Sequence, residues 1–296
     1  MCPQIMELKD IIIFYHADCH DGFGGAFAAY KKFGDSASYI PLMHDGTGAA
    51  SQLNGELVGK DVYMIDFCSS ATVMNDLQKK TRSLTVLDHH KSAEEVVKSL
   101  PNHRYALDHS GAYIAWEYFH PNTAVPKFIQ YIEDGDLWRF TLPDSKALLI
   151  YLKTKELNFN IYENLQREFE DPKRIKEAAK RGALYEEYWD ILVEMFAAQA
   201  KEVKFAGHTI LAVHAPRIFR SDVGNKLAQK NPPFCIVWYF YSNGIHCSMR
   251  SAEKAFDVSK IAEKYGGGGH AGAASFTFAV DIPFPWKSVD TLPEKE

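Results

Sequence analysis

The sequence predicts an α/β protein that contains a doubly wound, mostly parallel sheet and a second, smaller α+β domain joined to it by helices. Three observations lead to this prediction. In the first half, short apolar runs alternate with amphipathic segments of helical length, which is typical of parallel strands connected by helices. Residues 145–205 have an almost entirely helical pattern. In the second half, two apolar runs flank Ser242-Asn243-Gly244, and Asn-Gly between such runs is a strong hairpin signal.

The first domain is expected to span residues 1–170, with strands and helices in alternation. The expected strands are 10–15, 38–43, 61–67 and 83–90. The expected helices are 22–34, 71–80, 92–100, 110–119 and 126–138. Ser92 is the expected N-cap of its helix, because a Ser hydroxyl accepts hydrogen bonds from the first amides. With 296 residues, 46% of them hydrophobic, the chain can fill the cores of one large or two medium domains.

A helical connector at 171–205 is expected to lead into the second domain, which spans 206–280. The connector forms either one long helix or two helices separated at Gly182. Ser221 is the expected N-cap of its helix, and residues 281–296 form a polar, Pro-rich tail. The other expected elements are strands at 206–215 and 274–280, a hairpin within 234–251, and helices at 221–230 and 257–266.

Charge and cysteine content exclude several classes of protein. The net charge of −5 and the pI of about 6.2 exclude a general basic coat for long nucleic acid, but leave room for a local basic pocket that binds a short phosphorylated ligand. The five cysteines form no CxxC pair, which argues against a zinc knuckle or a disulfide framework and favours free thiols in a reducing cytosol. Because a signal-peptide core and a membrane-length apolar run are both missing, a soluble, cytoplasmic protein without a membrane partner is expected.

Acids and histidines stand where the predicted strands end. Ligands of an open parallel sheet bind beyond the carboxyl ends of its strands, so these positions are candidates for a site. Each group alone fits a polar turn or a helix cap, but their coincidence at one edge favours a site. The candidates are His16, Asp18, His20 and Asp21 after the first strand, Asp66 after the third, Asp88, His89 and His90 after the fourth, and Asp134 and Asp136 at a helix end.

Carboxylates gathered at one edge point to a bound cation, because otherwise they would repel each other and shift each other's pKa. Carboxylate and imidazole ligands together suit Mn²⁺, Fe²⁺, Zn²⁺ or Mg²⁺, and this mixture favours Mn²⁺. Several carboxylates can bridge two ions about 3.5–4 Å apart, as in hydrolytic two-metal sites. The sequence therefore predicts a two-metal site in which a hydroxide that bridges the ions is the nucleophile.

A second candidate site is the glycine-rich run GGGGHAGAASF at 266–276. Its backbone amides can bind an anion, and His270 adds a donor or a charge. The run follows a helix and lacks Gly-Lys-Ser/Thr, so it is not a P-loop. Helix capping would explain Gly266 but not the other glycines. Upstream, Arg250 in SMRS (248–251) suits bidentate phosphate binding, with an exposed structural arginine as the alternative.

Two motifs carry a resemblance to a known family. LDHHKSA resembles the motif that gives the DHH phosphoesterase superfamily its name, and GGGGHAGAASF with SMRS resembles the glycine-rich motif of the C-terminal DHHA1 domain. The resemblance covers about residues 10–280 and keeps the order of the motifs. With the opening FYHADCHDGFGGAFAAYKKFG, it is greatest for the small oligoribonucleases (nanoRNases) and cyclic-nucleotide phosphodiesterases.

The resemblance implies two divalent ions, usually Mn²⁺ with Mg²⁺, Co²⁺ or Fe²⁺ as alternatives, and a role for each matched residue. Asp88 orients and His90 faces the phosphate, so these two are the expected catalytic residues. The metal ligands that it implies are His16, Asp18, Asp21, Asp66, His89 and either Asp134 or Asp136. The substrate-binding residues that it implies in the second domain are Arg250, Ser251, Gly267, Gly268, Gly269 and His270.

Two positions depart from the family pattern. The family usually has an acid two residues before the position of Asp21, where this chain has Cys19 and the nearest acid is Asp18. The fourth motif is matched twice, because both Asp134 and Asp136 have an aromatic residue four positions further on. The sequence leaves open whether Asp18 is a ligand and which of the two later acids is.

Residues and resemblance together predict a phosphodiesterase or phosphohydrolase that acts on short oligoribonucleotides or small phosphorylated nucleotides. A short substrate fits an acidic chain, because affinity for a long strand depends on many phosphate contacts. The alternative substrates are 3′-phosphoadenosine 5′-phosphate, a cyclic mono- or dinucleotide, and polyphosphate. Two non-enzymatic alternatives are a metal-free nucleotide-binding regulator and, less favoured, a structural partner protein. The oligomeric state is open, with a homodimer as one alternative.

Overall fold

The computed structural model describes residues 8–43, 56–241, 244–252 and 256–289. The chain divides into two compact units, residues 1–186 and 187–296, with the boundary inside one long helix. The expected hairpin turn at Ser242-Asn243 lies outside the described residues. Among the helices in the described ranges, none combines the length and the apolarity that crossing a bilayer requires.

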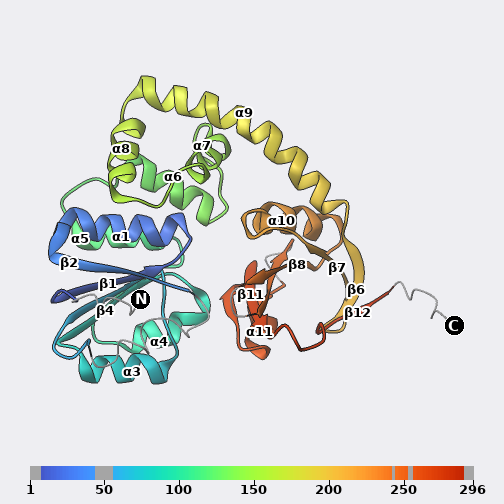
Figure 1. The fold of residues 1–296 in the computed structure, drawn as a ribbon, viewed down its shortest axis with the longest axis horizontal. Helices are drawn as coiled ribbons and strands as arrows, with labels where there is room; N and C mark the ends of the chain where they lie inside the picture. The colour runs from blue at the N-terminus through green and yellow to red at the C-terminus, as the bar shows by residue number, and fades with distance from the viewer. Residues whose placement is uncertain (1–7, 44–55, 242–243, 253–255, 290–296) are drawn as a thin grey trace, which may run out of the picture. The chain divides into compact units, whose positions relative to one another are not determined.

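The first unit is built on a five-stranded sheet in which all strands are parallel (Figure 1). The strand order is β2-β1-β3-β4-β5, so the winding direction reverses between β1 and β3. This is the predicted doubly wound α/β fold, which is confirmed. The strand β5 was not predicted, because three residues are too few to show a periodic pattern. The strands are β1 (Ile11–His16), β2 (Ala37–Leu42), β3 (Asp61–Ile65), β4 (Ser83–Asp88) and β5 (His103–Tyr105).

Helices cover both faces of this sheet. Neighbouring residues of a strand point to opposite faces, so Ile13 of β1 packs with α1 and α5, whereas Ile12 and Phe14 pack with α3 and α4. Figure 1 shows these two pairs of helices on the two sides of the strands. Burial on both faces explains why the strands read as continuous apolar runs. The four helices are α1 (His20–Phe33), α3 (Ala71–Lys80), α4 (Glu94–Ser99) and α5 (Gly111–Phe119).

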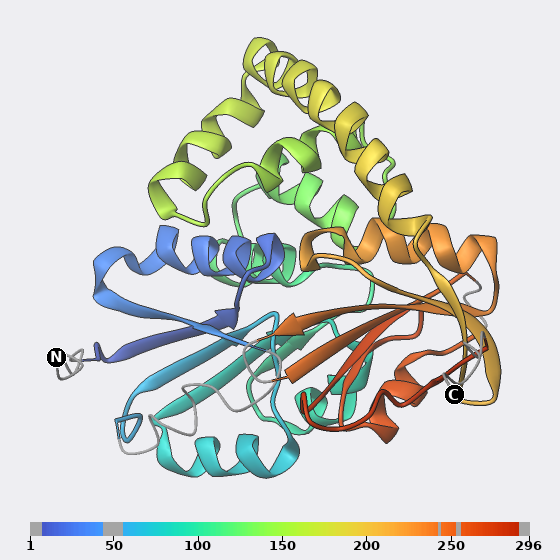
Figure 2. The ribbon, with the colours of Figure 1, turned by 45° about the vertical axis from the view of Figure 1, so that its right-hand side comes forward.

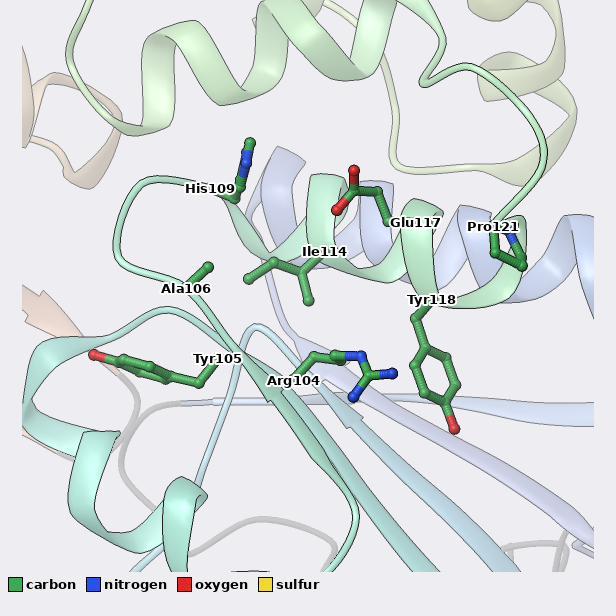
Figure 3. Close-up of a pocket in the computed structure, with 8 residues that line it drawn as sticks. All are labelled: Arg104, Tyr105, Ala106, His109, Ile114, Glu117, Tyr118 and Pro121. Atoms are coloured by element: carbon green, nitrogen blue, oxygen red, sulfur yellow. The ribbon is translucent and has the colours of Figure 1, made fainter.

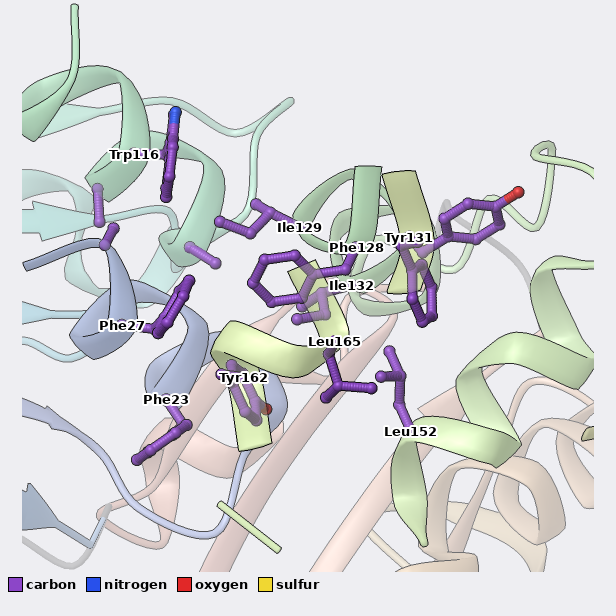
Figure 4. Close-up of a cluster of buried hydrophobic side chains, with 14 of the residues drawn as sticks. Phe23, Phe27, Trp116, Phe128, Ile129, Tyr131, Ile132, Leu152, Tyr162 and Leu165 are labelled. Carbon is purple, nitrogen blue, oxygen red and sulfur yellow. The ribbon is translucent and has the colours of Figure 1, made fainter. Parts of the chain in front are cut away.

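A further layer of helices packs on α1 and α5. Tyr162 of this layer is fully buried, and its ring centre lies 4.7 Å from that of Phe23 and 5.7 Å from that of Phe128. Figure 4 shows Tyr162 beside Phe23 and Phe27 of α1. This aromatic core fixes the position of α1, whose first turn carries candidate site residues. The helices of the layer are α6 (Lys127–Asp136), α7 (Ser145–Lys153) and α8 (Phe159–Glu170).

The connector helix α9 (Pro172–Ala197) is continuous over 26 residues, so Gly182 does not break it. A Cβ atom at Gly182 would lie 2.0 Å from the carbonyl oxygen of Ala147. The glycine is therefore needed for the close approach of α7 to α9. Of the two alternatives that the sequence left open, the structure contains the single helix.

The second unit contains a seven-stranded mixed sheet with the order β10-β11-β9-β8-β7-β6-β12. The helix α10 (Arg220–Lys230) and the end of α9 pack on one face, and α11 (Ser259–Lys264) packs on the other (Figure 2). This sheet with its helices is the second α+β element of the predicted fold. Its strands are β6 (Lys201–Phe205), β7 (His208–His214), β8 (Phe234–Tyr241), β9 (Gly244–Ser251), β10 (Gly268–His270), β11 (Ala273–Phe278) and β12 (Lys287–Ser288).

Three local predictions were wrong. Ser92 lies inside a 3₁₀ turn that precedes α4, whose N-cap is Ala93. Ser221 lies within α10, where its hydroxyl accepts a hydrogen bond from Arg250 instead of capping the helix. Residues 201–205 form β6 and not helix, because Val203 and Phe205 alternate with exposed residues and the strand pairs with β7. The polar tail also contributes β12, which pairs with β6.

Candidate metal centre

The candidate site lies at the carboxyl ends of β1, β3 and β4. The chain leaving β1 enters α1 on one face of the sheet, whereas the chain leaving β3 leads to α3 on the other face. Connections that diverge in this way leave a crevice beyond the strand ends, where ligands of such sheets bind. His16 is the last residue of β1, Asp66 follows β3 directly, and Asp88 is the last residue of β4.

A close approach of α1 to β1 brings His16 and Asp21 to the same place. A Cβ atom at Gly22 would lie 2.2 Å from the carbonyl oxygen of His16, so only glycine fits there. From the other side, the backbone N–H groups of Gly111 and Ala112 donate to the two oxygens of Asp21 at 2.7 and 2.9 Å. These amides belong to the N-terminus of α5, which stabilises a carboxylate.

Eight side chains gather at these strand ends, and we call them the strand-end cluster. Five are buried, two are partly buried, and the last lies at the solvent side with 29% of its side chain exposed. The buried members are His16, Asp21, Asp66, Asp88 and His89, the partly buried members are Cys19 and His90, and the member at the solvent side is Asp136.

Asp66 lies close to all three histidines of the strand-end cluster. Its Oδ2 lies 3.3 Å from Nδ1 of His16, and its Oδ1 lies 3.2 Å from Nε2 of His89 and 3.8 Å from Nδ1 of His90. The φ angle of Asp66 is 56°, in the left-handed region that few residues other than glycine adopt. Strained backbone of this kind is typical of functional sites. The turn places one carboxylate between imidazoles that come from β1 and from the end of β4.

Asp88 holds both histidines of the DHH stretch. Its Oδ1 accepts hydrogen bonds from the backbone N–H groups of His89 at 2.7 Å and His90 at 3.2 Å, and it lies 2.8 Å from Nδ1 of His90. Nε2 of His89 then lies 3.5 Å from Oδ2 of Asp136 and 3.7 Å from Oδ2 of Asp21. This geometry supports the orienting role of Asp88, which remains a proposal.

The structure separates the two candidates for the fourth motif. Both oxygens of Asp134 accept hydrogen bonds from Thr141, Leu142 and Ser145. This buried carboxylate therefore fixes the conformation of the loop after α6. Asp136, two residues later, turns toward His89 and belongs to the strand-end cluster. Asp134 therefore has a structural role, and a metal-binding role of Asp136 is a proposal that this placement supports.

Three other polar residues lie apart from the strand-end cluster. Asp18 is exposed, with a φ of 51°, and is in none of the metal-binding groups among the described residues. His20 turns into the first unit, where its Nδ1 lies 2.7 Å from the hydroxyl of Tyr162 and burial lowers its pKa to about 4. Nδ1 of His109 lies 3.0 Å from Oε2 of Glu133.

Burial and neighbouring charges shift the pKa values of several residues in the strand-end cluster. Burial, followed by the charges of Asp66 and Asp136, raises the pKa of Asp21 well above its usual value. Burial acts in the same direction on Asp66, but the imidazoles of His16 and His89 beside its oxygens outweigh burial and hold the pKa well below normal. For Cys19, burial and then the nearby carboxylates raise the thiol pKa. An added cation would relieve this repulsion.

The donor atoms fit divalent metal ions. Within each of three groups, one donor atom per residue lies within 4.8 Å of the others. Two buried oxygens, Oδ1 of Asp66 and Oδ2 of Asp88, accept no hydrogen bond within the described residues. Buried oxygens normally have a partner, and a cation would supply one. The groups are His16 with Cys19 and Asp66, Asp21 with His89 and Asp136, and Asp66 with Asp88 and His90.

A pocket of about 310 Å³ lies elsewhere in the first unit, between β5 and α5. Figure 3 shows Arg104 and Tyr105 of β5 opposite Ile114 and Tyr118 of α5, with His109 at one end. This pocket shares no residue with the strand-end cluster, and its lining contains no comparable group of acids and histidines. The candidate metal centre is therefore the strand-end cluster.

In the second unit, Arg250 is held rigidly on β9. Its Nη1 donates to Oγ of Ser248 and to the carbonyl of Met249 at 2.9 and 2.8 Å, and its Nη2 donates to Oγ of Ser221 at 2.9 Å. Burial, followed by the charge of Arg220, lowers the pKa of Arg250 to about 10. Arg250 is thus a partly buried, oriented guanidinium and not an exposed surface arginine.

Two further arginines, which the sequence analysis missed, share these surroundings. The guanidinium of Arg217 lies 5.9 Å from the ring centre of Tyr241, and Arg220 donates to the carbonyl of Arg217. Burial, and then the charges of Arg220, Arg217 and Arg250, lower the pKa of His246 to about 4. Like charges gathered in this way favour a bound anion. The spacing of three residues, which places both arginines on one helical face, was the signal that could have revealed them.

The glycine-rich run has structural reasons for three of its four glycines, and helix capping accounts only for Gly266 among them. Gly266 has a φ of 74° after α11, and Gly269 has a φ of 139°. A Cβ atom at Gly267 would lie 2.0 Å from the carbonyl oxygen of Ser275. The run is partly strand, since β10 pairs with β11. Beside it, Ser251 donates its backbone N–H to Gly272. A role of the Gly267–His270 segment in substrate binding stays a proposal.

Comparisons with known proteins give a consistent relationship. No protein-family model matches the sequence. The uncharacterized protein R106 of Acanthamoeba polyphaga mimivirus is 30% identical over 300 residues, which cover 94% of this chain and 70% of that protein. Oligoribonuclease NrnB of Bacillus subtilis is 23% identical over 311 residues, which cover 90% of this chain and 74% of NrnB. The DHH domain of a member of the s1p family of ribosomal proteins superposes with a TM-score of 0.57 at 12% identity, over 92% of this chain and 83% of that domain.

The doubly wound sheet, whose strand ends gather acids and histidines, superposes on a DHH domain, so this chain has the fold of that domain. The chain belongs to the same family as the viral protein R106.

Proposed function

We propose that this protein is a divalent-metal-dependent phosphoesterase that hydrolyses short oligoribonucleotides or small phosphorylated nucleotides. One observation carries the proposal: three strand ends and the end of α6 bring four aspartates and three histidines together, with two buried carboxylate oxygens that lack a hydrogen-bond partner in the described residues. A structural polar network would satisfy such oxygens, whereas metal ligands keep them directed at the ion.

Different residues of the strand-end cluster would bind each of the two ions. Asp66 belongs to the donor group of His16, and its Oδ1 lies 3.2 Å from Nε2 of His89 in the second group, so it is the residue that would hold both ions. His16 would complete one position, and Asp21, His89 and Asp136 would complete the other. When bound, divalent ions supply electrostatic stabilisation of the phosphoryl oxygens and a nucleophilic hydroxide at neutral pH.

His90 is the residue that we assign to the phosphate. Its Nδ1 is fixed by Oδ1 of Asp88 at 2.8 Å, which places the proton on Nδ1 in the neutral ring. Nε2 is then the ring nitrogen that is left to contact a phosphoryl oxygen.

The second unit supplies positive charge for the substrate. Arg250 is oriented by three hydrogen bonds, and Arg217 and Arg220 lie in the same surroundings. Guanidinium groups bind phosphate with directional, charge-assisted hydrogen bonds. The amides of the Gly267–His270 segment are proposed to add neutral donors to this set.

Short oligoribonucleotides are preferred among the substrates for two reasons. The relative NrnB is named an oligoribonuclease and aligns over most of both chains, although at only 23% identity. The net charge of −5 disfavours long strands, whose binding depends on many phosphate contacts. A phosphorylated mononucleotide, a cyclic dinucleotide and polyphosphate are the competing substrates in the same assay.

The test is a substrate panel of oligoribonucleotides of two to five units, the competing small nucleotides and polyphosphate, each with a divalent metal and with a chelator. We expect turnover of one of these substrates that the chelator abolishes. Asp66→Ala should lower kcat/KM by about a thousandfold or more, because it removes several kcal/mol of transition-state stabilisation. Asp76→Ala, which removes an exposed carboxylate on α3, is the matched control and should retain activity.

Absence of turnover for every substrate with any of Mn²⁺, Mg²⁺, Co²⁺, Fe²⁺ or Zn²⁺ would refute the enzymatic function and favour a nucleotide-binding regulator. Full activity of Asp66→Ala would instead show that catalysis takes place away from the strand-end cluster.

A further inference from the structure

Cys19 occupies an unusual place at the start of α1. It is the N-cap residue of the helix, with extended backbone angles, yet its side chain makes no capping hydrogen bond. Its Sγ instead lies within 4.8 Å of a ring nitrogen of His16 and a carboxylate oxygen of Asp66. The donors of a single ion lie within about 4.6 Å of each other, because each is about 2.0–2.3 Å from the metal. The spacing of these three atoms is therefore near that of one ion's ligands.

A second feature of the same group points to a ligand. Asp66 is 2% exposed, and its Oδ1 accepts no hydrogen bond in the described part of the chain. Nε2 of His89 lies only 3.2 Å from this oxygen, but not in the direction of a hydrogen bond. Donor atoms that are close but not aligned with each other are expected where they face a common cation.

The nearest acid does not take this place. Asp18 is the neighbour of Cys19, but it is exposed and turns away with a φ of 51°. It is in none of the donor groups that the described residues form. The position near His16 and Asp66 is thus filled by sulfur.

We propose that Cys19 is a thiolate ligand of one metal position, with His16 and Asp66, and that it makes this position selective for Zn²⁺, Co²⁺ or Fe²⁺ over Mn²⁺ and Mg²⁺. The inference deepens the proposed metal-dependent function and rests on it. On coordination, the thiol releases its proton to solvent and the sulfur lone pair forms the bond to the ion, so no redox partner is needed.

The two positions would then differ in metal preference. Soft thiolate ligands select Zn²⁺ and related ions, whereas carboxylate and imidazole ligands also accept Mn²⁺. The second position, formed by Asp21, His89 and Asp136, has only oxygen and nitrogen donors. The chain would bind one ion of a thiophilic metal tightly, and its neighbour would remain exchangeable with harder ions. The expectation of Mn²⁺ is kept for the second position alone.

Cobalt spectroscopy tests the ligand directly and without substrate. The full chain is stripped with a chelator, kept anaerobic and titrated with Co²⁺. We expect a near-ultraviolet thiolate-to-cobalt charge-transfer band that saturates at one equivalent. The band should vanish in Cys19→Ser and Cys19→Asp, both of which suit an N-cap position. It should persist in Cys68→Ser, since Cys68 is partly buried but in none of the described donor groups.

Competition between metals gives the second readout. Cys19→Asp should still bind Co²⁺ and Mn²⁺, but should lose at least about tenfold of its preference for Zn²⁺ over Mn²⁺, since even outer-shell changes alter metal affinity by 10–100-fold. A wild-type chain without the band, a band that survives Cys19→Ser, or an unchanged preference in Cys19→Asp would each overturn the inference.

Activity separates this inference from the proposed function. Metal-dependent turnover without the charge-transfer band would remove Cys19 from the ligands and leave the phosphoesterase intact. The band without turnover of any phosphoester would establish the ligand and refute the activity.

Discussion

Asp66 carries much of the energetic cost of building the site. A residue other than glycine in left-handed backbone costs about 1–3 kcal/mol, and Asp66 is buried as well, beside Asp21 and Asp88. Such a residue persists only where the surrounding structure holds it, here through His16 and His89. Bound cations would return stability to the folded chain, because only the folded state has the assembled site.

Asp136→Asn should leave the metal-free protein as stable as the wild type or more stable, because it removes one of several neighbouring negative charges. It should weaken metal binding. Metal at a hundredfold excess over its Kd stabilises the wild type by about 2.7 kcal/mol, and a tenfold loss of affinity removes about 1.4 kcal/mol of this. Denaturation curves with and without metal measure both effects.

Asp134→Asn is the matched control, two residues away. It should destabilise the protein by about 2–3 kcal/mol, because hydrogen bonds to a buried charge from Thr141, Leu142 and Ser145 are weakened. The metal-induced gain in stability should be unchanged. The reverse pattern, with metal binding lost in Asp134→Asn and retained in Asp136→Asn, would reverse the assignment of the two acids.

His246 gives the second unit a pH-dependent stability. Its folded pKa is lowered to about 4, first by burial and then by Arg220, Arg217 and Arg250. The unfolded chain therefore binds the proton more readily, so the stabilising contribution is complete above pH ~6.5 and is lost as the pH falls toward 4. We expect a loss of roughly 2–3 kcal/mol, given that the ring is partly exposed.

His246→Gln should remove this contribution, since Gln stays neutral and can still bond Thr277. Urea denaturation of both proteins between pH 7.5 and pH 4.5 measures the difference in slope. Parallel pH dependences would show that His246 is not held neutral by its surroundings.

At this scale, sequence reasoning located candidate residues but not all of their partners. Asp66 and His89 could be predicted from the sequence, because the ends of parallel strands meet at one edge. Asp134 and Asp136 could not be told apart, because only the loop after α6 shows which carboxylate is satisfied by Thr141 and Ser145. The role of Cys19 was hidden for a similar reason, since the turn after β1 decides whether Asp18 or Cys19 faces His16.

At the scale of elements, the N-terminus of α5 holds two carboxylates of the strand-end cluster in place. Gly111 lies against Asp66, where a Cβ atom would approach the Asp66 Cβ to 2.6 Å. Its N–H group also donates to Asp21. The helix therefore controls the separation of two proposed ligands that come from different strands.

Gly111→Ala should displace α5 and with it the carboxylate of Asp21. Overpacking of this kind destabilises by about 1–3 kcal/mol, and a misplacement near 1 Å lowers activity by about a hundredfold. Metal titration and kcat of the soluble variant measure the result.

Gly182→Ala provides the control, because its methyl group would also collide with backbone, at the Ala147 carbonyl between α7 and α9. It should cost comparable stability but leave metal affinity unchanged. Equal losses of metal affinity in the two variants would show that the effect of Gly111→Ala is a general consequence of destabilisation.

Element types were predictable where periodicity was long and failed where it was short. The apolar runs of β1, β3 and β4 identify buried parallel strands, because both faces of that sheet are covered. β5 has three residues and β6 has five at the end of a helical stretch, so neither shows a clear period. Gly182 looked like a possible break because sequence alone cannot distinguish a flexible glycine from one that permits close packing.

At the scale of the whole molecule, the two units carry complementary chemistry. The first gathers carboxylates and histidines that suit cations, and the second gathers Arg217, Arg220 and Arg250, which suit anions. The overall charge of −5 conceals this division, since the arginines become a group only when α10 packs beside β9. The fold class could be predicted from the alternation of elements in the sequence. The arginine group could not be predicted, because it forms only through packing within the second unit.

The most direct test of the account is metal-specific anomalous diffraction from crystals of the metal-loaded chain. It should show two ions about 3.5–4 Å apart, with Asp66 between them, His16 and Cys19 at one ion, and His89 and Asp136 at the other. Anomalous density that is absent from the neighbourhood of Asp66, or ions bound by other residues only, would contradict the metal centre on which the proposed phosphoesterase activity depends.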